Sequence, residues 1–419
     1  MLPSSPTRRR RSSSIASILQ PLQINTSPQR SPKRSHNRRK SESSEGSHRR
    51  QRRVSFTTPI SNTHRISNHT GFSSASHDVC IQTISFTTSA SCVTLLEREA
   101  VASIPSVYSN PQPSSNPYQV SLCHSDTDQR SAEYGVFATR KIPRGGAVLV
   151  ERPVMLVSSN SLAGCNIDQL LDSKVREAVL RLTDAHAKSA EGTLEGIMKT
   201  NGLEIEIGST KCISLFLDMS RVNHSCGPNA MWRWDPSSFS ITLEAVRPIS
   251  EGSEITIPYI DCLQSRAERR KQLKALYNFD CYCQYCDVHW SEPNASVQSD
   301  LDRKELLEFS TSSHRVPSFE SWYADKNLPD DALIELHLWA LETRAKEGLE
   351  LFAYKKHIDV IAMCFGALED VENFRCWTER ARNARMEEKT ESEIAVLETW
   401  IQDPRMFPVW GWRRRALAQ

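Results

Sequence analysis

Three closely spaced cysteines place the tightest constraint on how this chain can fold. They form the segment Cys281-Tyr-Cys-Gln-Tyr-Cys286, in which three thiols lie within six residues. Thiolates at this spacing can converge on one tetrahedral Zn²⁺ ion, so the pattern favours a structural zinc site. Such a site needs a fourth ligand, and Cys262 and His289 are two nearby candidates. We therefore expect the chain to fold around a metal ion at this point.

The charge is unevenly distributed along the 419 residues. Residues 1–77 carry 15 Lys and Arg but only two acidic residues, which leaves 37 basic and 48 acidic residues for the remainder. This first segment is rich in Ser, Arg and Pro and poor in large apolar groups, so it cannot offset the entropy cost of becoming ordered. We expect a disordered arm, which is either a solvated tail or a segment that directs nuclear import or contacts nucleic acid.

The sequence shows no secretory signal and no apolar run of membrane-spanning length, so no membrane partner is expected. The expected location is the nucleus and/or the cytoplasm. Because both compartments are reducing, the clustered cysteines are interpreted as metal ligands and not as disulfide partners.

Hydrophobic patterning divides the chain into a β-rich part and a helical part. Residues 1–116 are expected to be arm and linker, although Val79–Phe86 alternates like a strand. Apolar residues at helical spacing predict an amphipathic helix over 166–187, within an insert that ends near residue 200. Alternation and turn residues predict strands at 118–123, 136–138, 147–153, 203–207, 241–245 and 254–257.

The carboxy-terminal part is predicted to be mostly helical over 300–402. Apolar stripes at helical spacing run through 334–345 and 349–364, as in helical hairpins. The region resembles a tetratricopeptide-like array but has no clean repeat period. Residues 403–419 are expected to be a tail.

Four segments together resemble the SET-domain protein methyltransferases. The segment Asn223-His-Ser-Cys-Gly-Pro-Asn229 matches the family's NHSCxPN signature, and Glu251-Gly-Ser-Glu-Ile-Thr-Ile-Pro-Tyr-Ile-Asp261 resembles its second signature. Tyr134–Gly145 resembles the opening segment, and Cys281–Cys286 resembles the post-SET zinc element. The similarity is greatest to the SET- and MYND-domain-containing subfamily. Residues 158–200 lack the cysteine and histidine pattern of a MYND finger, so the chain resembles a MYND-less relative.

The resemblance implies an α+β fold. It comprises a SET domain of small curved β-sheets over 117–278, with a helical insert at about 166–200, and a zinc-binding post-SET element at 279–290. In this fold Asn223–Asn229 is threaded beneath the Tyr259 segment as a pseudoknot, an exception to the usual unknotted topology. The mostly helical domain at 300–402 follows.

The resemblance also implies transfer of a methyl group from S-adenosylmethionine to a lysine side-chain amine in a protein substrate. The attacking amine must be neutral, whereas a free lysine has a pKa of about 10.4. Deprotonation at pH 7 therefore costs about 4.6 kcal/mol, which an apolar channel and a nearby sulfonium cation would reduce. In-line attack needs positioning and no covalent intermediate, so a tyrosine can serve the site, and the family's catalytic tyrosine corresponds to Tyr259.

The same resemblance assigns the remaining site residues. Cys226 takes the fourth place on the zinc ion, beside Cys281, Cys283 and Cys286. The residues implied to contact S-adenosylmethionine are Tyr134, Gly135, Asn201, Asn223, His224, Tyr259 and Phe279. Two positions depart from the family pattern: Glu133 replaces a glycine in the opening segment, and Pro258 replaces a common serine before Tyr259.

Those departures keep a second function open, a catalytically silent SET module that acts as a protein-interaction scaffold. In a third interpretation, the basic arm carries the function of the protein by binding nucleic acid. For an active enzyme, histones and other lysine-bearing proteins are equally compatible substrates.

Overall fold

The computed structural model describes most of the chain from residue 62 onward. The described ranges are 62–63, 65–69, 79–86, 90–105, 107–109, 116–123, 134–162, 167–187, 192–287, 293–311, 316–350, 354–388 and 391–418. Within these ranges, no helix is both long enough and apolar enough to cross a bilayer.

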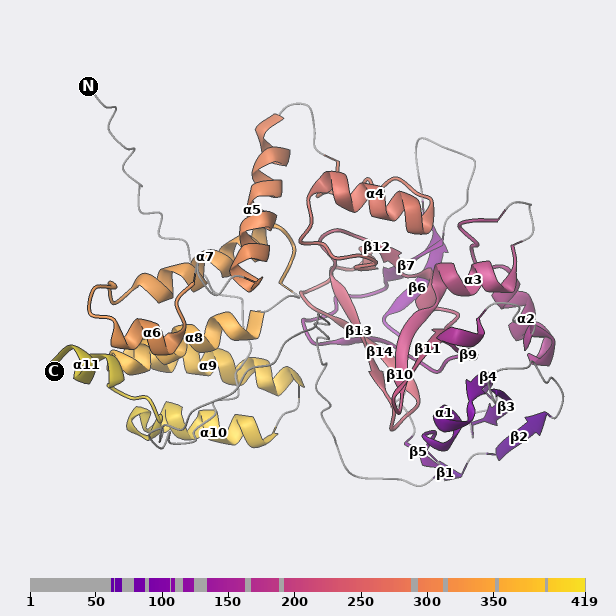
Figure 1. Cartoon of the computed structure of the whole chain (residues 1–419), viewed down its shortest axis with the longest axis horizontal. Helices are drawn as coiled ribbons and strands as arrows, with labels where there is room; N and C mark the ends of the chain where they lie inside the picture. The colour runs from indigo at the N-terminus through magenta and orange to yellow at the C-terminus, as the bar shows by residue number, and fades with distance from the viewer. Residues whose placement is uncertain are drawn as a thin grey trace, which may run out of the picture.

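The structure has a lobe of small β-sheets and a lobe of helices, with helix α5 (Pro293–Thr311) standing between them (Figure 1). The described strands are β1 (Asn62–Thr63), β2 (Arg65–His69), β3 (Val79–Ser85), β4 (Ser91–Glu97), β5 (Val107–Tyr108), β6 (Tyr118–Leu122), β7 (Tyr134–Ala138), β8 (Ala147–Glu151), β9 (Met155–Ser158), β10 (Leu203–Ile207), β11 (Thr210–Leu215), β12 (Asn223–His224), β13 (Ala230–Asp235), β14 (Ser240–Ala245) and β15 (Glu254–Ile257). The predicted α+β architecture is confirmed.

The described strands form four sheets. Their orders are β1-β5, β10-β11-β9-β4-β3-β2, β12-β15-β7-β6 and β13-β14-β8. The last two sheets enclose a core in which Val136, Ile241 and Ile255 are fully buried. All six predicted strands are present, and β6, β10 and β14 alternate apolar residues with polar ones at the period of a pleated strand.

The expectation that residues 1–116 are only arm and linker is wrong for the segment that begins at β3. Strands β3 and β4 form an antiparallel hairpin, and β4 pairs in parallel with β9 through Val93 and Met155. The physical reason is burial: the alternation noted at 79–86 continues in β4, where Val93 and Leu96 are fully buried. Residues 1–61 lie outside the described residues.

The helical insert is present, but the predicted helix over 166–187 is shorter than expected. The insert contains α2 (Ser173–Leu180) and α3 (Leu194–Asn201), preceded by the 3-10 turns η1 (Ser159–Ser161) and η2 (Ile167–Leu170). After α2 the Asp184 carboxylate accepts hydrogen bonds from the backbone N–H groups of His186 and Thr193. These side-chain bonds replace helical ones, so the chain turns and restarts as α3.

Two helices in the β-rich lobe were missed, the short α1 (Arg98–Ala102) and the longer α4 (Arg266–Tyr277), which lies between the second signature and the cysteine cluster. The Ser265 side chain caps α4 by accepting from the Glu268 N–H at 3.3 Å. Ser followed three residues later by Glu is the sequence pattern of a capping box, so a local signal for this helix existed.

The carboxy-terminal lobe is helical as predicted, and successive helices pack against one another. The helices that follow the cysteine cluster are α5 (Pro293–Thr311), α6 (Phe319–Ala324), α7 (Ala332–Lys346), α8 (Tyr354–Ala367), α9 (Val371–Glu388), α10 (Glu391–Gln402) and α11 (Trp412–Ala418), with the 3-10 turn η4 (Pro404–Met406). Helix α1 (Arg98–Ala102) and the 3-10 turn η3 (Met219–Arg221) belong to the β-rich lobe.

The prediction of a tail at 403–419 is wrong. Turn η4 and helix α11 fold back onto the helical lobe, where Phe407 and Val409 are buried in the core. The Arg413 guanidinium is also buried and donates hydrogen bonds to the carbonyls of Trp322, Asp325 and Leu328. A stretch that contains three consecutive arginines at 413–415 looks solvated in sequence, yet its tryptophans and Phe407 give it an apolar face to bury.

We predict that Leu96→Ala destabilises the protein by about 2–5 kcal/mol, because it removes a fully buried side chain of β4 and leaves a cavity. Leu180→Ala makes the same chemical change at a side chain that is 43% exposed, so it should change stability by less than about 0.5 kcal/mol. Thermal unfolding measures both. Equal effects would mean that the β3–β4 hairpin does not pack on the lobe.

Candidate active site

The two signature segments cross one another in the β-rich lobe. Strand β12 pairs in parallel with β15, which sets Asn223 opposite Thr256 and His224 opposite Ile257. The Asn229 side chain makes two hydrogen bonds to β15. Its amide nitrogen donates to the Glu254 carbonyl, and its oxygen accepts from the Thr256 N–H, each at 2.8 Å. The predicted proximity of these segments is confirmed.

A buried carboxylate shapes the chain just before the crossing. Glu151, at the end of β8, accepts backbone hydrogen bonds from Leu217, Asp218 and Met219 at 2.7–3.0 Å. Burial raises the pKa of Glu151 to about 7. The turn that leads into Asn223 is therefore held by one side chain from a neighbouring sheet.

Tyr259 lies at the centre of the crossing. Its hydroxyl donates to the Val222 carbonyl at 2.7 Å, and its N–H donates to His224 Nδ1 at 3.0 Å. Its ring centroid is 4.9 Å from that of Tyr277, which in turn is 6.5 Å from Phe279. These three rings are only half-buried. The arrangement presents a phenol oxygen beside aromatic faces that a flat, partly apolar ligand can cover.

His224 connects the tyrosine to the cysteine cluster. Because Nδ1 accepts from the Tyr259 N–H, the imidazole proton is assigned to Nε2, which lies 3.3 Å from Cys226 Sγ. Burial lowers the pKa of His224 to about 4, so the ring is neutral at pH 7. Both ring nitrogens are thus engaged within the protein, which leaves only the backbone of His224 for the predicted cofactor contact.

Asn223 is held beside the opening strand. Its amide nitrogen donates to the Tyr134 carbonyl at 3.2 Å and to Glu254 Oε1 at 2.8 Å. A Cβ at Gly135 would lie 2.7 Å from Glu254 Oε1 and 2.8 Å from Cys123 Sγ, so the glycine lets these two side chains approach the opening strand closely. The predicted residues Tyr134, Gly135 and Asn223 therefore lie together.

Glu254 and Cys123 were not assigned a role from the sequence. Glu254 stands inside the second signature, so its position was a usable signal. Cys123 is a single thiol that follows β6 directly, and nothing local marks it as a neighbour of Asn223.

Asn201 is placed differently from the other predicted cofactor contacts. Its amide nitrogen donates to the carbonyls of Thr183 and Ile197, at 2.7 and 2.8 Å, both within the helical insert. These bonds give Asn201 a structural role at the end of α3. Its cofactor role stays a prediction.

The four predicted metal ligands come together. The Sγ atoms of Cys226, Cys281, Cys283 and Cys286 all lie within 4.8 Å of one another, and those of Cys226 and Cys286 are 3.5 Å apart. Hydrogen bonds from the neighbouring thiols lower the pKa of Cys283. The group could hold a metal ion.

Among the described residues, the rival ligand Cys262 is not part of this group. The Cys262 thiol donates to the carbonyls of Ser225 and Ile260 at 3.9 and 3.5 Å. His289 lies outside the described residues. Glu133, one of the two departures from the family pattern, lies outside them as well.

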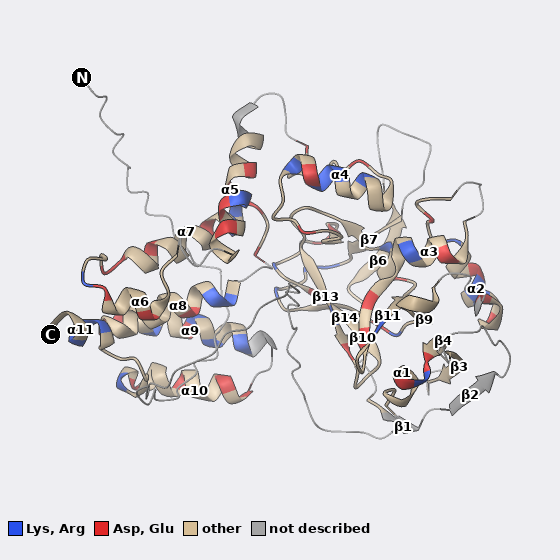
Figure 2. Ribbon diagram, viewed as in Figure 1, with Lys and Arg blue, Asp and Glu red and all other residues tan. Residues whose placement is uncertain are grey.

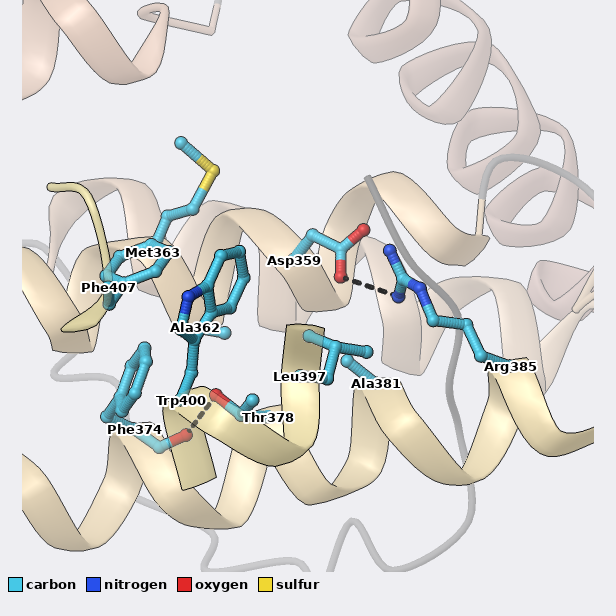
Figure 3. A pocket seen from close by; sticks show the side chains of 10 residues that line it. All are labelled: Asp359, Ala362, Met363, Phe374, Thr378, Ala381, Arg385, Leu397, Trp400 and Phe407. Carbon is cyan, nitrogen blue, oxygen red and sulfur yellow. Dashed lines mark hydrogen bonds and ion pairs between the residues drawn. The ribbon is translucent and has the colours of Figure 1, made fainter. Parts of the chain in front are cut away.

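A separate small cavity of about 20 Å³ lies in the helical lobe, between α8, α9 and α10 (Figure 3). Its volume is that of about one water molecule. Asp359 points toward Arg385 across it, with Oδ1 3.7 Å from Nη1, and burial raises the pKa of this carboxyl well above its usual value. Phe374, Trp400 and Phe407 pack closely beside it. This cavity is an imperfection in a packed core and not a competing active site.

The comparison with known proteins matches this geometry. The sequence profile of the SET domain matches residues 133–260, which include both crossing segments. The chain contains a SET domain. The resemblance drawn from the motifs is confirmed.

Three relatives illustrate the similarity. Histone-lysine N-methyltransferase set5 of Schizosaccharomyces pombe is 35% identical over 194 residues, which are 46% of this chain and 58% of the relative. Histone-lysine N-methyltransferase SMYD3 of Mus musculus is 36% identical over 96 residues, 23% of this chain and 22% of the relative. Protein-lysine N-trimethyltransferase SMYD5 of Homo sapiens is 39% identical over 87 residues, 20% of this chain and 21% of the relative. The matches thus span less than two thirds of each relative.

We predict that Asn229→Ala destabilises the SET domain by about 2 kcal/mol, because it leaves the Glu254 carbonyl and the Thr256 N–H without their partner. Asn373→Ala, at an exposed position whose side chain bonds only Asp370, is the matched control and should cost less than about 1 kcal/mol. Thermal unfolding and amide hydrogen exchange at Thr256 check both. Unchanged protection at Thr256 would contradict the crossing.

Proposed function

We propose that this protein transfers a methyl group from S-adenosylmethionine to the side-chain amine of a lysine in a protein substrate. The observation that carries the proposal is the parallel pairing of β12 with β15, which places Asn223 and Tyr259 at one crossing. The SET match and the names of the relatives support the same reaction. Tyr259 is the proposed catalytic residue.

The residues at the crossing suit the reaction. When bound, S-adenosylmethionine supplies an electrophilic methyl group on a sulfonium ion. The Tyr259 hydroxyl donates to the Val222 carbonyl at 2.7 Å, so the two oxygens lie side by side, and their remaining lone pairs could accept weak contacts from the C–H groups of the methyl donor. The rings of Tyr277 and Phe279 offer the partly apolar surroundings that favour a neutral lysine amine over its charged form. Asn223, Tyr134 and Gly135 are proposed to hold the methyl donor.

The four thiols fit a structural Zn²⁺ ion. A tetrahedral Zn–S distance of about 2.3 Å requires sulfurs about 3.8 Å apart, close to the separations within this cluster. Cys226 precedes β13 and the other three follow α4, so a zinc ion would tie the crossing to the segment that carries Phe279. His224 Nε2–H would then donate to a metal-bound thiolate, as outer-shell groups commonly do.

No observation favours the silent-scaffold interpretation. Pro258 lacks an N–H, but the next residue, Tyr259, still makes both of its bonds at the crossing. Because two of the relatives are named histone-lysine methyltransferases, we propose histones as the first substrates to test, in the nucleus or the cytoplasm.

Nucleic-acid contact by residues 1–77 stays a prediction, since the strongly basic clusters lie outside the described residues. In the described part, acidic and basic side chains are interspersed over much of both lobes, whereas the charged residues of α4 are mostly basic (Figure 2).

We predict that Tyr259→Phe lowers kcat for methyl transfer at least about 100-fold, because it removes the hydroxyl that the Val222 carbonyl positions at the crossing. Radiolabelled methyl transfer to histones and to a whole-cell lysate measures this effect. Tyr282→Phe, at a side chain that is 72% exposed, is the control and should be unchanged. Full activity of Tyr259→Phe would remove Tyr259 from catalysis, and absence of S-adenosylmethionine binding to the unaltered protein in calorimetry would support the scaffold.

We predict that Cys283→Ser lowers the zinc content from about one ion per chain to well below half, because only three thiolates remain. Elemental analysis of the purified protein measures the content. Cys376→Ser removes an exposed thiol of α9 and should leave it unchanged. Equal zinc content in both variants would contradict the proposed ligand set.

A further inference from the structure

One buried arginine of the helical lobe reaches both crossing segments of the SET domain. The Arg303 side chain, on α5, is fully buried, with 0% of its area exposed. Its Nη1 donates to the Cys226 carbonyl at 3.1 Å and also to the Cys262 carbonyl. Cys226 follows His224 by two residues, and Cys262 follows Tyr259 by three. A single guanidinium therefore joins the ends of the two segments that form the active site.

Glu347 fixes this arginine in place. Its Oε2 accepts from Arg303 Nε at 2.9 Å, and its backbone carbonyl accepts from Nη2 at 3.1 Å. The Ser299 hydroxyl donates to the same carboxylate oxygen at 2.6 Å. The Glu347 side chain is itself 4% exposed, so both charges are removed from water and neutralise one another.

A second arginine–glutamate pair, Arg247 with Glu350, binds the carbonyl of the residue that follows Cys226. Arg247 donates to the Gly227 carbonyl at 2.8 Å, and its guanidinium lies 3.4 Å from the Glu350 carboxylate. Glu347 and Glu350 belong to the same turn after α7. Between them Gly348 has φ +63°, and a Cβ there would lie 2.7 Å from the Tyr285 ring of the cysteine loop. This turn of the helical lobe is therefore fitted against the metal-ligand segment.

We infer that Arg303, held by Glu347, is a positioning residue for methyl transfer. It acts through the carbonyls of Cys226 and Cys262 and sets the spacing between the Asn223–His224 segment and Tyr259. A guanidinium suits this role because its planar fork can bond to carbonyls from separate segments at once. The inference rests on the proposed function for its kinetic consequence, but its effect on the cysteine cluster does not.

The simplest rival is that Arg303 only stabilises the helical lobe. Arg413 provides the comparison, since its side chain is 1% exposed and it also donates to three carbonyls and pairs with an aspartate, Asp330. All of these partners lie within the helical lobe. Loss of Arg413 should therefore disturb that lobe without reaching the crossing.

The test compares Arg303→Met, Arg303→Lys and Arg413→Met in the full chain. Zinc transfer to a colorimetric chelator is followed in time, and kcat and KM for S-adenosylmethionine are measured on a histone substrate. Arg303→Met should weaken zinc binding about 10- to 100-fold, the range seen when a group that supports a metal ligand is lost, and should therefore release zinc to the chelator faster than the unaltered protein. Its kcat should fall by a similar factor. Arg303→Lys keeps the charge but not the fork, so its zinc release should be intermediate.

Arg413→Met should lower the thermal midpoint yet keep zinc release and kcat within about twofold of the unaltered protein. The inference is overturned if folded Arg303→Met or Arg303→Lys holds zinc as firmly as the unaltered chain. It is equally overturned if Arg413→Met releases zinc as fast as Arg303→Met, because the effect is then one of general stability. If Arg303→Met is insoluble, Arg303→Lys and Glu347→Gln decide the question by the same measurement. If the unaltered protein binds zinc but transfers no methyl group, the proposed function fails while the zinc comparison still stands.

Discussion

The short parallel pairing of β12 with β15 is the interaction on which the rest of the structure depends. It contains only two residue pairs, Asn223 with Thr256 and His224 with Ile257. So small a contact cannot be stable alone, and the surrounding groups compensate for this. Glu151 holds the chain that enters it, Asn229 ties the segment after β12 to β15, and Arg303 holds the segments that leave it. Several independent side chains therefore hold this one crossing.

The neutral ring of His224 lies next to three groups of the candidate site. Its Nδ1 orients the backbone at Tyr259, its Nε2–H faces the thiol of Cys226, and its ring lies 6.3 Å from that of Phe279. A charged imidazolium could not accept at Nδ1, so the low pKa caused by burial is a condition for this geometry. The proposed metal and the proposed catalytic tyrosine are therefore not separate parts of the molecule.

Features that depend only on neighbouring residues could be predicted from the local sequence pattern. Strands such as 241–245 were predictable because apolar residues alternate, and the Cys281–Cys286 loop was predictable because its spacing fits one metal ion. The crossing itself came only from the family resemblance, since the register between residues 35 positions apart leaves no trace in either segment. The role of Arg303 could not be predicted for a related reason. An arginine in a polar stretch is normally solvated, and the burial of Arg303 depends on carbonyls contributed by distant segments.

The placement of Arg303 also bears on how the protein is made. Synthesis begins at the amino terminus, so β12, β15 and the four cysteines leave the ribosome before Arg303 and well before Glu347. Until the turn after α7 has emerged, the carbonyls of Cys226 and Cys262 lack the cation that joins them. The nascent SET domain therefore stays incomplete while the second lobe is still being translated. Chaperones and proteases would encounter the SET domain in that incomplete state first.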